Sequence, residues 1–207
     1  FCYMQKSPSM EVYEKSVRLA AENGITHLSN YLLYNFKDKP IELYYRMKKN
    51  VELCDELGIS IYSFPMKYHP IQDPKYFRDR TYLGEHWNRK FIRSVQAILN
   101  STKGKIGRGK SFFAEAFGKD EEGFMERMYM PEAMIIYRFY YKENGLEPEW
   151  WDEFKRVSSI SLSKKQQLEK IIGANDFSNI ESLTSDDDIM KVLHYYTITR
   201  NDFESKK

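Results

Sequence analysis

The stretch that decides the fold is ITHLSNYLLYNF, residues 25 to 36, taken together with ISIYSF, residues 59 to 64. Both are short and rich in β-branched and aromatic residues, which favours strands over helices. Between them, Asp38-Lys39-Pro40 opens a segment whose apolar residues recur in steps of three and four, which predicts a helix ending at Gly58. A strand, a helix and a strand within about forty residues form a right-handed crossover, so we expect a parallel sheet.

A further helix is expected before the first of these strands. Ser7-Pro8-Ser9 is a helix-start signal, and Gly24 is a stop after the amphipathic run that follows. Residues 9 to 64 therefore predict the order helix, strand, helix, strand. Ligands of parallel α/β sheets lie at the carboxyl ends of the strands. In this chain those ends are Tyr34-Asn35-Phe36 and Phe64-Pro65-Met66.

The pattern changes near residue 70, where a long polar connection with two prolines begins. After it, apolar residues recur only at helical spacing. The expected helices lie at 88–100, 111–117, 121–129, 132–142, 149–157, 163–172 and 186–194. The sequence thus predicts an α/β segment followed by a mostly α-helical C-terminal extension.

Composition limits the class of protein. Of the 207 residues, 42% are apolar and 30% are charged, which is typical of a soluble globular protein of one domain or slightly more. No apolar run approaches the ~20 residues of a membrane helix and no signal-peptide pattern is visible, so we expect no membrane partner. The two cysteines form neither a disulfide framework nor a metal motif, and the four histidines are isolated. A reducing cytoplasm and no metal site are expected.

The start of the chain is apolar. FCYMQKSPSM has the composition of a strand, whereas chain termini are commonly polar and loosely held. We therefore expect that the chain is a segment from inside a larger domain.

The central stretch LSNYLLYNFKDKPIELYYRMKKNVELCDELGISIYSFPMKY, residues 28 to 68, resembles the last two β/α units of radical S-adenosylmethionine (SAM) enzymes. In that family the fifth barrel strand often has the pattern G-x-I-x-G-x-x-E. Tyr31-x-Leu33-x-Asn35-x-x-Asp38 has the same spacing, with both glycines replaced and Asp in place of Glu. The later stretches HWNRKFIR and TKGKIGRGKSFF are similar to sequences of one subgroup of the family, which extends the resemblance to about residue 140.

The resemblance implies a fold and two domains. Residues 1–70 are expected to form the C-terminal β/α units of a partial parallel (β/α) barrel, and residues 71–207 a helical extension. Radical SAM chemistry needs a [4Fe–4S] cluster held by a C-x-x-x-C-x-x-C loop, and this chain lacks that motif. The chain is then either the C-terminal half of such an enzyme, with its own N-terminal half as a partner, or a relative that has lost the chemistry. By itself it would be inactive.

The resemblance also implies which residues contact the cofactor. The ends of the last strands line the SAM pocket in this family, so the candidate SAM-binding residues are Ser29, Asn35, Asp38, Phe64, Pro65 and Met66. Each also has a structural interpretation: Asn35 can simply end a strand, and Phe64 and Met66 can fill a core. No catalytic residue and no substrate can be named from the sequence.

A basic stretch runs from Trp87 to Ala114, with seven Lys or Arg and no Asp or Glu. Interleaved aromatic residues make binding of RNA or single-stranded DNA by residues 87–113 an alternative function, and a solvated helix face with inward aromatics is the simpler interpretation. Basic groups could also attract an anionic substrate to the barrel mouth. The candidates for substrate or anion binding are Lys67, His69, Arg89, Lys90, Arg93 and Lys110. His69, which precedes Pro70, also fits an exposed loop histidine.

The same stretch contains Gly104-x-x-x-x-Gly109-Lys110-Ser111, the spacing of a nucleotide-binding P-loop. A P-loop follows a buried strand, whereas a helix is expected before this one. No strand ending in an acid is present to hold Mg²⁺. A P-loop phosphotransferase is therefore the weakest of the three functions that the sequence suggests.

Overall fold

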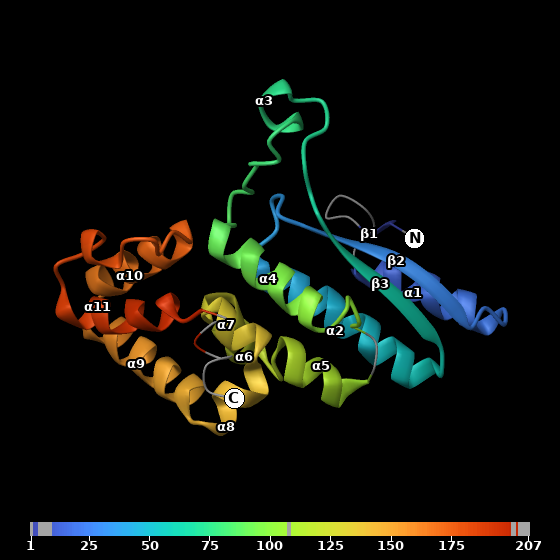
Figure 1. The fold of residues 1–207 in the computed structure, drawn as a ribbon. Helices are drawn as coiled ribbons and strands as arrows, with labels where there is room; N and C mark the ends of the chain where they lie inside the picture. The colour runs from blue at the N-terminus through green and yellow to red at the C-terminus, as the bar shows by residue number, and fades with distance from the viewer. Residues whose placement is uncertain (1, 4–9, 107–108, 200–201, 203–207) are drawn as a thin grey trace. The chain divides into compact units, whose positions relative to one another are not determined.

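The chain is a mixed α/β protein in which helices predominate (Figure 1). The structure is a computed structural model, and it describes residues 2–3, 10–106, 109–199 and 202. These residues divide into two compact units. Unit 1 comprises the described parts of residues 1–88 and 98–125, and unit 2 those of residues 89–97 and 126–207. Helices α4 (Arg89–Ser101) and α6 (Glu121–Tyr129) contribute residues to both.

Unit 1 is built on a parallel sheet with the strand order β1-β2-β3. Strands β2 (His27–Tyr34) and β3 (Ser60–Lys67) pair along their full length, from His27 with Ser60 to Tyr34 with Lys67. The two-residue strand β1 (Cys2–Tyr3) runs parallel beside β2. The crossover between β2 and β3 is helix α2 (Pro40–Leu57), which begins at a proline and ends at Gly58 in the left-handed conformation (φ 64°). The predicted parallel β-α-β arrangement is confirmed.

Strand β3 runs three residues beyond the predicted end at Phe64, through Pro65 to Lys67. A proline lacks the N–H that a central strand needs, which is why the sequence predicts a stop there. Among the described residues β3 is an edge strand, so one side of it makes no ladder bonds. An edge position tolerates a proline whose nitrogen faces away from the neighbouring strand.

The helices of unit 1 cover one face of the sheet. Helix α1 (Met10–Glu22) packs against α2, and α2 contacts both β2 and β3. The remaining helices of the unit are α3 (Pro74–Phe77), in the long connection after β3, and α5 (Lys110–Phe117), which packs on α2. Tyr44 of α2 lies against the rings of Phe113 and Phe124, at centroid distances of 5.5 and 5.2 Å.

A chain of hydrogen bonds joins four elements beneath the covered face. Asn30 of β2 donates to the Tyr13 hydroxyl (2.6 Å), which donates to Oδ1 of Asn50 (2.7 Å). The Asn50 amide in turn donates to Ser63 of β3 (2.8 Å). All four side chains are buried. Buried polar groups are costly unless they are paired, so this network sets how α1 and α2 dock on the sheet.

Unit 2 is helical. Besides its parts of α4 and α6, it contains five helices and two 3₁₀ turns in the described residues: α7 (Glu132–Ile136), α8 (Arg138–Glu143), α9 (Leu146–Ile160), α10 (Leu162–Ala174), η1 (Ile180–Ser182), α11 (Asp187–His194) and η2 (Tyr195–Thr197). Helix α9 contacts α8, α10 and α11, and its Trp150 is fully buried. The predicted helical character of this region is confirmed.

One predicted helix is wrong in its extent. The apolar spacing predicts a single helix over 132–142, but the structure has two, α7 and α8, separated at Tyr137. The backbone of Tyr137 (φ −110°, ψ 39°) lies outside the helical region. Apolar periodicity indicates which residues face the core, but it does not predict an interruption of the helix at a single residue. The helix-start signal Ser7-Pro8-Ser9 lies outside the described residues.

No helix in the described part of the chain is both long enough and apolar enough to cross a bilayer.

Candidate functional site

The exposed face of the β2–β3 sheet is the first feature of the candidate site. Side chains alternate between the two faces of a strand, and here the alternation separates buried from exposed residues. On the face opposite α2, the exposed fractions are 46% for Tyr31, 51% for Tyr62, 42% for Phe64 and 42% for Met66. The Phe64 ring lies 5.5 Å from that of Tyr31 and 4.4 Å from that of Tyr62. These four side chains form a continuous apolar surface, which we call the aromatic face.

Three of the six predicted SAM-contacting residues belong to this face of the sheet. Phe64 and Met66 are part of the aromatic face, and Ser29, which pairs in register with Tyr62, is exposed on the same side. Pro65 alternates with Phe64 and Met66, so it lies on the helix-covered side and is half-buried.

Asn35 is placed at the end of β2, as predicted, but its amide is bound by protein atoms. Asn35 is fully buried with a left-handed backbone (φ 69°). Its Nδ2 donates to the carbonyl oxygens of Tyr68 (3.2 Å) and Tyr82 (3.1 Å), and its Oδ1 accepts from the Gly84 amide (2.9 Å). Asn35 thus anchors the segment that follows β3, residues 68–84, to the carboxyl end of the sheet.

Gly84 shows how close that anchoring is. A Cβ atom at Gly84 would lie 2.2 Å from the carbonyl oxygen of Phe36, which is backbone and cannot move aside. Glu85 then donates its amide to the same carbonyl (3.2 Å). The sequence does not reveal this need for glycine, because Phe36 and Gly84 are far apart along the chain.

Asp38 is also bound within the protein. Its Oδ1 accepts from the Phe36 amide (2.9 Å), and its Oδ2 forms an ion pair with Arg46 of α2 (2.6 Å). Both side chains are almost completely buried, with exposed fractions of 2% and 7%. The Trp87 indole donates to the Asp38 carbonyl (2.8 Å). Asp38 therefore shapes the turn between β2 and α2, a role that sequence spacing alone could not distinguish from ligand contact.

The segment after β3 holds the first two candidate anion-binding residues. Lys67 donates through Nζ to the Arg80 carbonyl (3.0 Å), and burial, with the nearby Arg80 charge, lowers the pKa of its ammonium. His69 is half-buried. The rings of Tyr68 and Tyr76 each meet that of Tyr82 edge-on, at 5.5 and 5.3 Å. These contacts give the segment a small aromatic core of its own.

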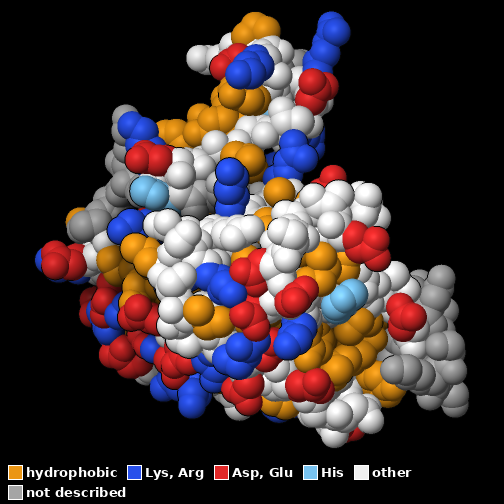
Figure 2. All heavy atoms as spheres, turned by 90° about the vertical axis from the view of Figure 1, so that its left-hand side faces the viewer, with side chains coloured by type: hydrophobic (Ala, Val, Ile, Leu, Met, Phe, Trp, Pro, Cys, Tyr) orange, Lys and Arg blue, Asp and Glu red, His pale blue; other side chains and the backbone are white. Residues whose placement is uncertain are grey.

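The other four basic candidates lie in different environments. Arg89 is exposed, Lys90 is buried, Arg93 pairs with Glu132 (2.6 Å) and Lys110 pairs with Asp55 (3.7 Å). Three of the four aromatic residues of the same stretch, Trp87, Phe91 and Phe113, are buried, and Phe112 is half-buried. Figure 2 shows one face of the molecule, on which acidic and basic side chains are interspersed. Nucleic-acid binding by residues 87–113 stays a prediction that these placements do not support.

The P-loop pattern follows helix α4 rather than a strand. Its central residues, 107 and 108, lie outside the described part of the chain. Lys110 opens α5 and pairs with Asp55, which leaves its ammonium directed at a carboxylate of α2. The context that a phosphate-binding loop requires, a buried strand before the glycines, is missing.

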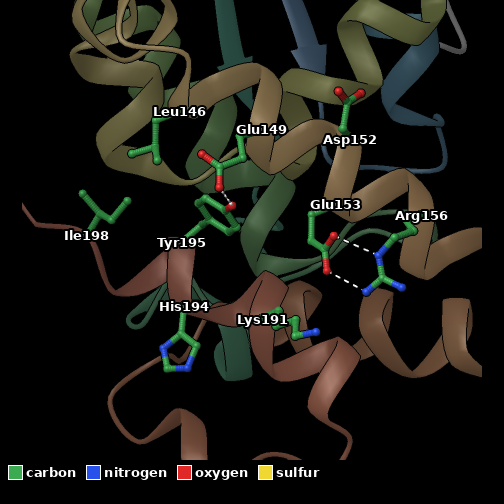
Figure 3. A pocket seen from close by; sticks show the side chains of 9 residues that line it. All are labelled: Leu146, Glu149, Asp152, Glu153, Arg156, Lys191, His194, Tyr195 and Ile198. Carbon is green, nitrogen blue, oxygen red and sulfur yellow. Dashed lines mark hydrogen bonds and ion pairs between the residues drawn. The ribbon is translucent and has the colours of Figure 1, made fainter.

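A wide groove of about 900 Å³ lies between α9 and α11 in unit 2 (Figure 3). Its polar groups are largely paired with one another. Glu149 accepts from the Tyr195 hydroxyl (2.9 Å), and Glu153 binds Arg156 through two hydrogen bonds of 2.7 and 2.9 Å. Burial, and then the bond to Glu149, raises the pKa of Tyr195 to about 12. Sequence reasoning did not identify this groove, because its walls come from helices about forty residues apart.

The side chains that could ligate a metal are dispersed in the described part of the chain. Cys54 lies in α2, where its sulfur accepts from the Ile61 amide (3.3 Å), and burial raises the pKa of its thiol. In the part of the chain that the structure describes, no three His, Cys, Asp or Glu side chains gather in a metal-binding group. These residues do not fit a [4Fe–4S] cluster, which needs several cysteine thiolates.

No protein-family model, curated protein or solved structure matches this chain.

Proposed function

We propose that the chain is the C-terminal portion of a radical SAM enzyme, in which β2, α2 and β3 are the last β/α units of a partial barrel. The aromatic face carries this proposal. Parallel sheets in proteins are covered on both faces, and here helices cover one face while Tyr31, Tyr62, Phe64 and Met66 remain exposed on the other. The inner wall of a barrel, completed by further strands, would cover that second face.

The aromatic face also suits one part of SAM. An exposed aromatic ring with an apolar neighbour is a suitable surface for a flat base such as adenine. Phe64 and Met66 provide such a surface in the carboxyl-terminal half of β3, where ligands of parallel sheets bind. The hydroxyl of Ser29 lies on the same face. In this proposal Asn35 and Asp38 act indirectly, by holding the loops around the strand ends.

The cluster is assigned to residues outside this chain. Cys54 is engaged with the β3 backbone, and no three His, Cys, Asp or Glu side chains of the described residues gather in a metal-binding group. Its ligands would belong to the N-terminal half of the protein. The cytoplasmic location stays a prediction of the sequence.

The coding sequence immediately upstream of Phe1 gives the first test. A C-x-x-x-C-x-x-C motif within a preceding series of β/α units is expected, and an upstream sequence without one would remove the catalytic part of the proposal.

The second test is SAM binding by the full-length protein, purified without oxygen and supplied with iron and sulfide. Phe64→Ala is expected to weaken SAM binding by roughly tenfold, as the loss of one stacking contact of about 1.4 kcal/mol would. Phe139→Ala is the matched control, because Phe139 is also an exposed phenylalanine (70%) but lies on α8 of unit 2. Equal SAM affinities for the two variants would contradict the assignment of the aromatic face.

A further inference from the structure

A second cavity, of about 440 Å³, lies within unit 2. Its wall combines aromatic and aliphatic side chains with a few polar groups: Lys90, Glu132, Ala133, Ile136, Tyr137, Asn175, Phe177, Tyr196, Ile198 and Thr199. Two of the aromatic rings, Phe177 and Tyr196, stack with their centroids 4.6 Å apart. The volume lies within the range of sites that hold one small molecule.

The unusual group in this wall is the ammonium of Lys90. Lysines are almost never fully buried, yet the exposed fraction of Lys90 is 1%. Its Nζ donates to the carbonyl of Met130 and to Oγ of Ser94 (2.8 Å). The Ser94 hydroxyl in turn donates a hydrogen bond to the Met128 carbonyl (2.9 Å). These bonds satisfy carbonyl groups at the end of α6, which explains why a polar group is buried there.

Those bonds use two of the three hydrogens of the ammonium. Among the described residues, no acceptor binds the third hydrogen, and the ring centroid of Tyr196 lies 6.0 Å from Nζ. The carboxylate of Glu132, whose charge acts on Lys90, is already bound to Arg93 by two hydrogen bonds of 2.6 Å. No carboxylate of the described residues forms an ion pair with Lys90, so its positive charge is buried beside the cavity at an energetic cost.

We propose that this cavity binds a small aromatic or aliphatic monocarboxylate, whose carboxylate accepts the third hydrogen of Lys90. The rings of Phe177 and Tyr196 and the side chains of Ile136 and Ile198 cover the apolar body of the ligand. An ion pair in a buried site gains most when hydrogen bonds complete it, and the carbonyl of Met130 and the hydroxyl of Ser94 already orient the ammonium. The site is independent of the SAM pocket proposed above.

The charge state of Lys90 gives the site a characteristic pH dependence. Burial lowers the pKa of Lys90 to about 7, with Glu132 opposing the shift and Arg93 adding to it. A bound carboxylate favours the ammonium, so binding takes up a proton when Lys90 is neutral beforehand. Affinity is therefore expected to fall roughly tenfold between about pH 6 and about pH 8, because the free protein loses the ammonium over that range.

Benzoate is the probe, and benzamide is its uncharged control of nearly the same shape. Both are titrated into the whole 207-residue chain by calorimetry at the two pH values. The proposal predicts that benzoate binds, that benzamide binds at least tenfold more weakly, and that the benzoate affinity falls at the higher pH. Equal affinities for the two compounds, or no binding of benzoate at either pH, would overturn it.

Two variants locate the binding to this cavity. Lys90→Met keeps the apolar stem and removes the charge, so benzoate binding should be lost. Ile136→Trp adds bulk to the cavity wall at a side chain that is 43% exposed, so the protein should fold and benzoate should bind at least tenfold more weakly. Ile160→Trp is the control, since Ile160 is 48% exposed and lies away from the wall. Benzoate binding that survives Ile136→Trp at the level of Ile160→Trp would overturn the proposal even if Lys90→Met fails to fold.

Discussion

The two faces of the β2–β3 sheet differ in what covers them. On one face, Leu32 and Ile61 are buried under helices, and the polar side chains among them are joined in a hydrogen-bond network. On the other face, the large aromatic side chains of Tyr31 and Phe64 remain nearly half exposed. Both faces therefore carry large apolar side chains, but these side chains are packed against other elements on one face only.

This difference indicates that the aromatic face is suited to contact with another surface rather than with solvent. Isolated exposed apolar residues are normal on protein surfaces, but a contiguous apolar surface usually marks an interaction site. In unit 2, by contrast, α9 is packed against three other helices and its Trp150 is fully buried. The following predictions test the contrast between the covered face and the aromatic face.

The largest effect is expected where burial is most complete. Asp38→Ala leaves the Arg46 guanidinium buried without its carboxylate, which should lower the free energy of unfolding by about 3–5 kcal/mol. Asp55→Ala is the control, because the Asp55 side chain is 39% exposed and its pairing with Lys110 should be worth under about 1 kcal/mol. Urea unfolding of both variants measures the difference, and similar losses would show that the Asp38 pair is solvated.

Adjacent leucines in β2 compare the two faces directly. Leu32 is completely buried on the covered face. Leu32→Ala should therefore lower the free energy of unfolding by about 2–5 kcal/mol, because apolar burial is lost and a cavity is left. Leu33 points to the opposite face and is half-buried, so Leu33→Ala should cost about 1 kcal/mol. Thermal or urea unfolding gives both values. Equal costs would mean that the second face is packed within this chain.

The hydrogen-bond network under the covered face should contribute less. Tyr13→Phe removes a hydroxyl that joins Asn30 to Asn50 and leaves their buried polar atoms unpaired, at a cost of about 1–3 kcal/mol. Tyr62→Phe removes the corresponding hydroxyl on the exposed face, and its free energy of unfolding should lie within about 0.5 kcal/mol of the wild-type value. A Tyr13→Phe variant as stable as Tyr62→Phe would show that water replaces the missing bond.

The smallest effect concerns alkaline pH. Burial raises the pKa of Tyr34 on the covered face to about 12, above the value of about 10 for an unfolded tyrosine. The unfolded chain therefore releases this proton first, so stability is unaffected below about pH 10 and falls as the pH rises toward about 12. Tyr34→Phe should flatten that part of the stability curve, measured by urea unfolding. Parallel curves for the wild type and Tyr34→Phe would contradict the burial of this hydroxyl.

Much of the local structure follows from the sequence. Residues 25–36 and 59–64 contain β2 and most of β3, Pro40 and Gly58 bound α2 as predicted, and their order implies the parallel pairing that the structure has. The spacing of the strand-end residues also singles out Asn35 and Asp38, as candidate cofactor-contacting residues. Their partners were not predictable, because Tyr68, Tyr82 and Gly84 reach Asn35 only after the connection following β3 folds back.

The aromatic face and the Lys90 cavity differ in how far each can be predicted from the sequence. The aromatic face lies on strands that the sequence predicts, and alternation along a strand assigns each residue to a face. The Lys90 cavity could not be inferred in this way. Lys90 is one of seven basic residues in its stretch, and its burial results from contacts with Met130 and Tyr196, which are 40 and 106 residues away.

The sequence by itself determined where helices and strands lie and that β2 and β3 run parallel, because periodicity, prolines and glycines act over a few neighbouring residues. Only the tertiary structure decided which face of the sheet is covered, which polar groups are bound by the protein, and which lysine is buried. The physical reason is that burial and hydrogen bonding depend on partners brought together from distant parts of the chain, and no local pattern encodes those partners.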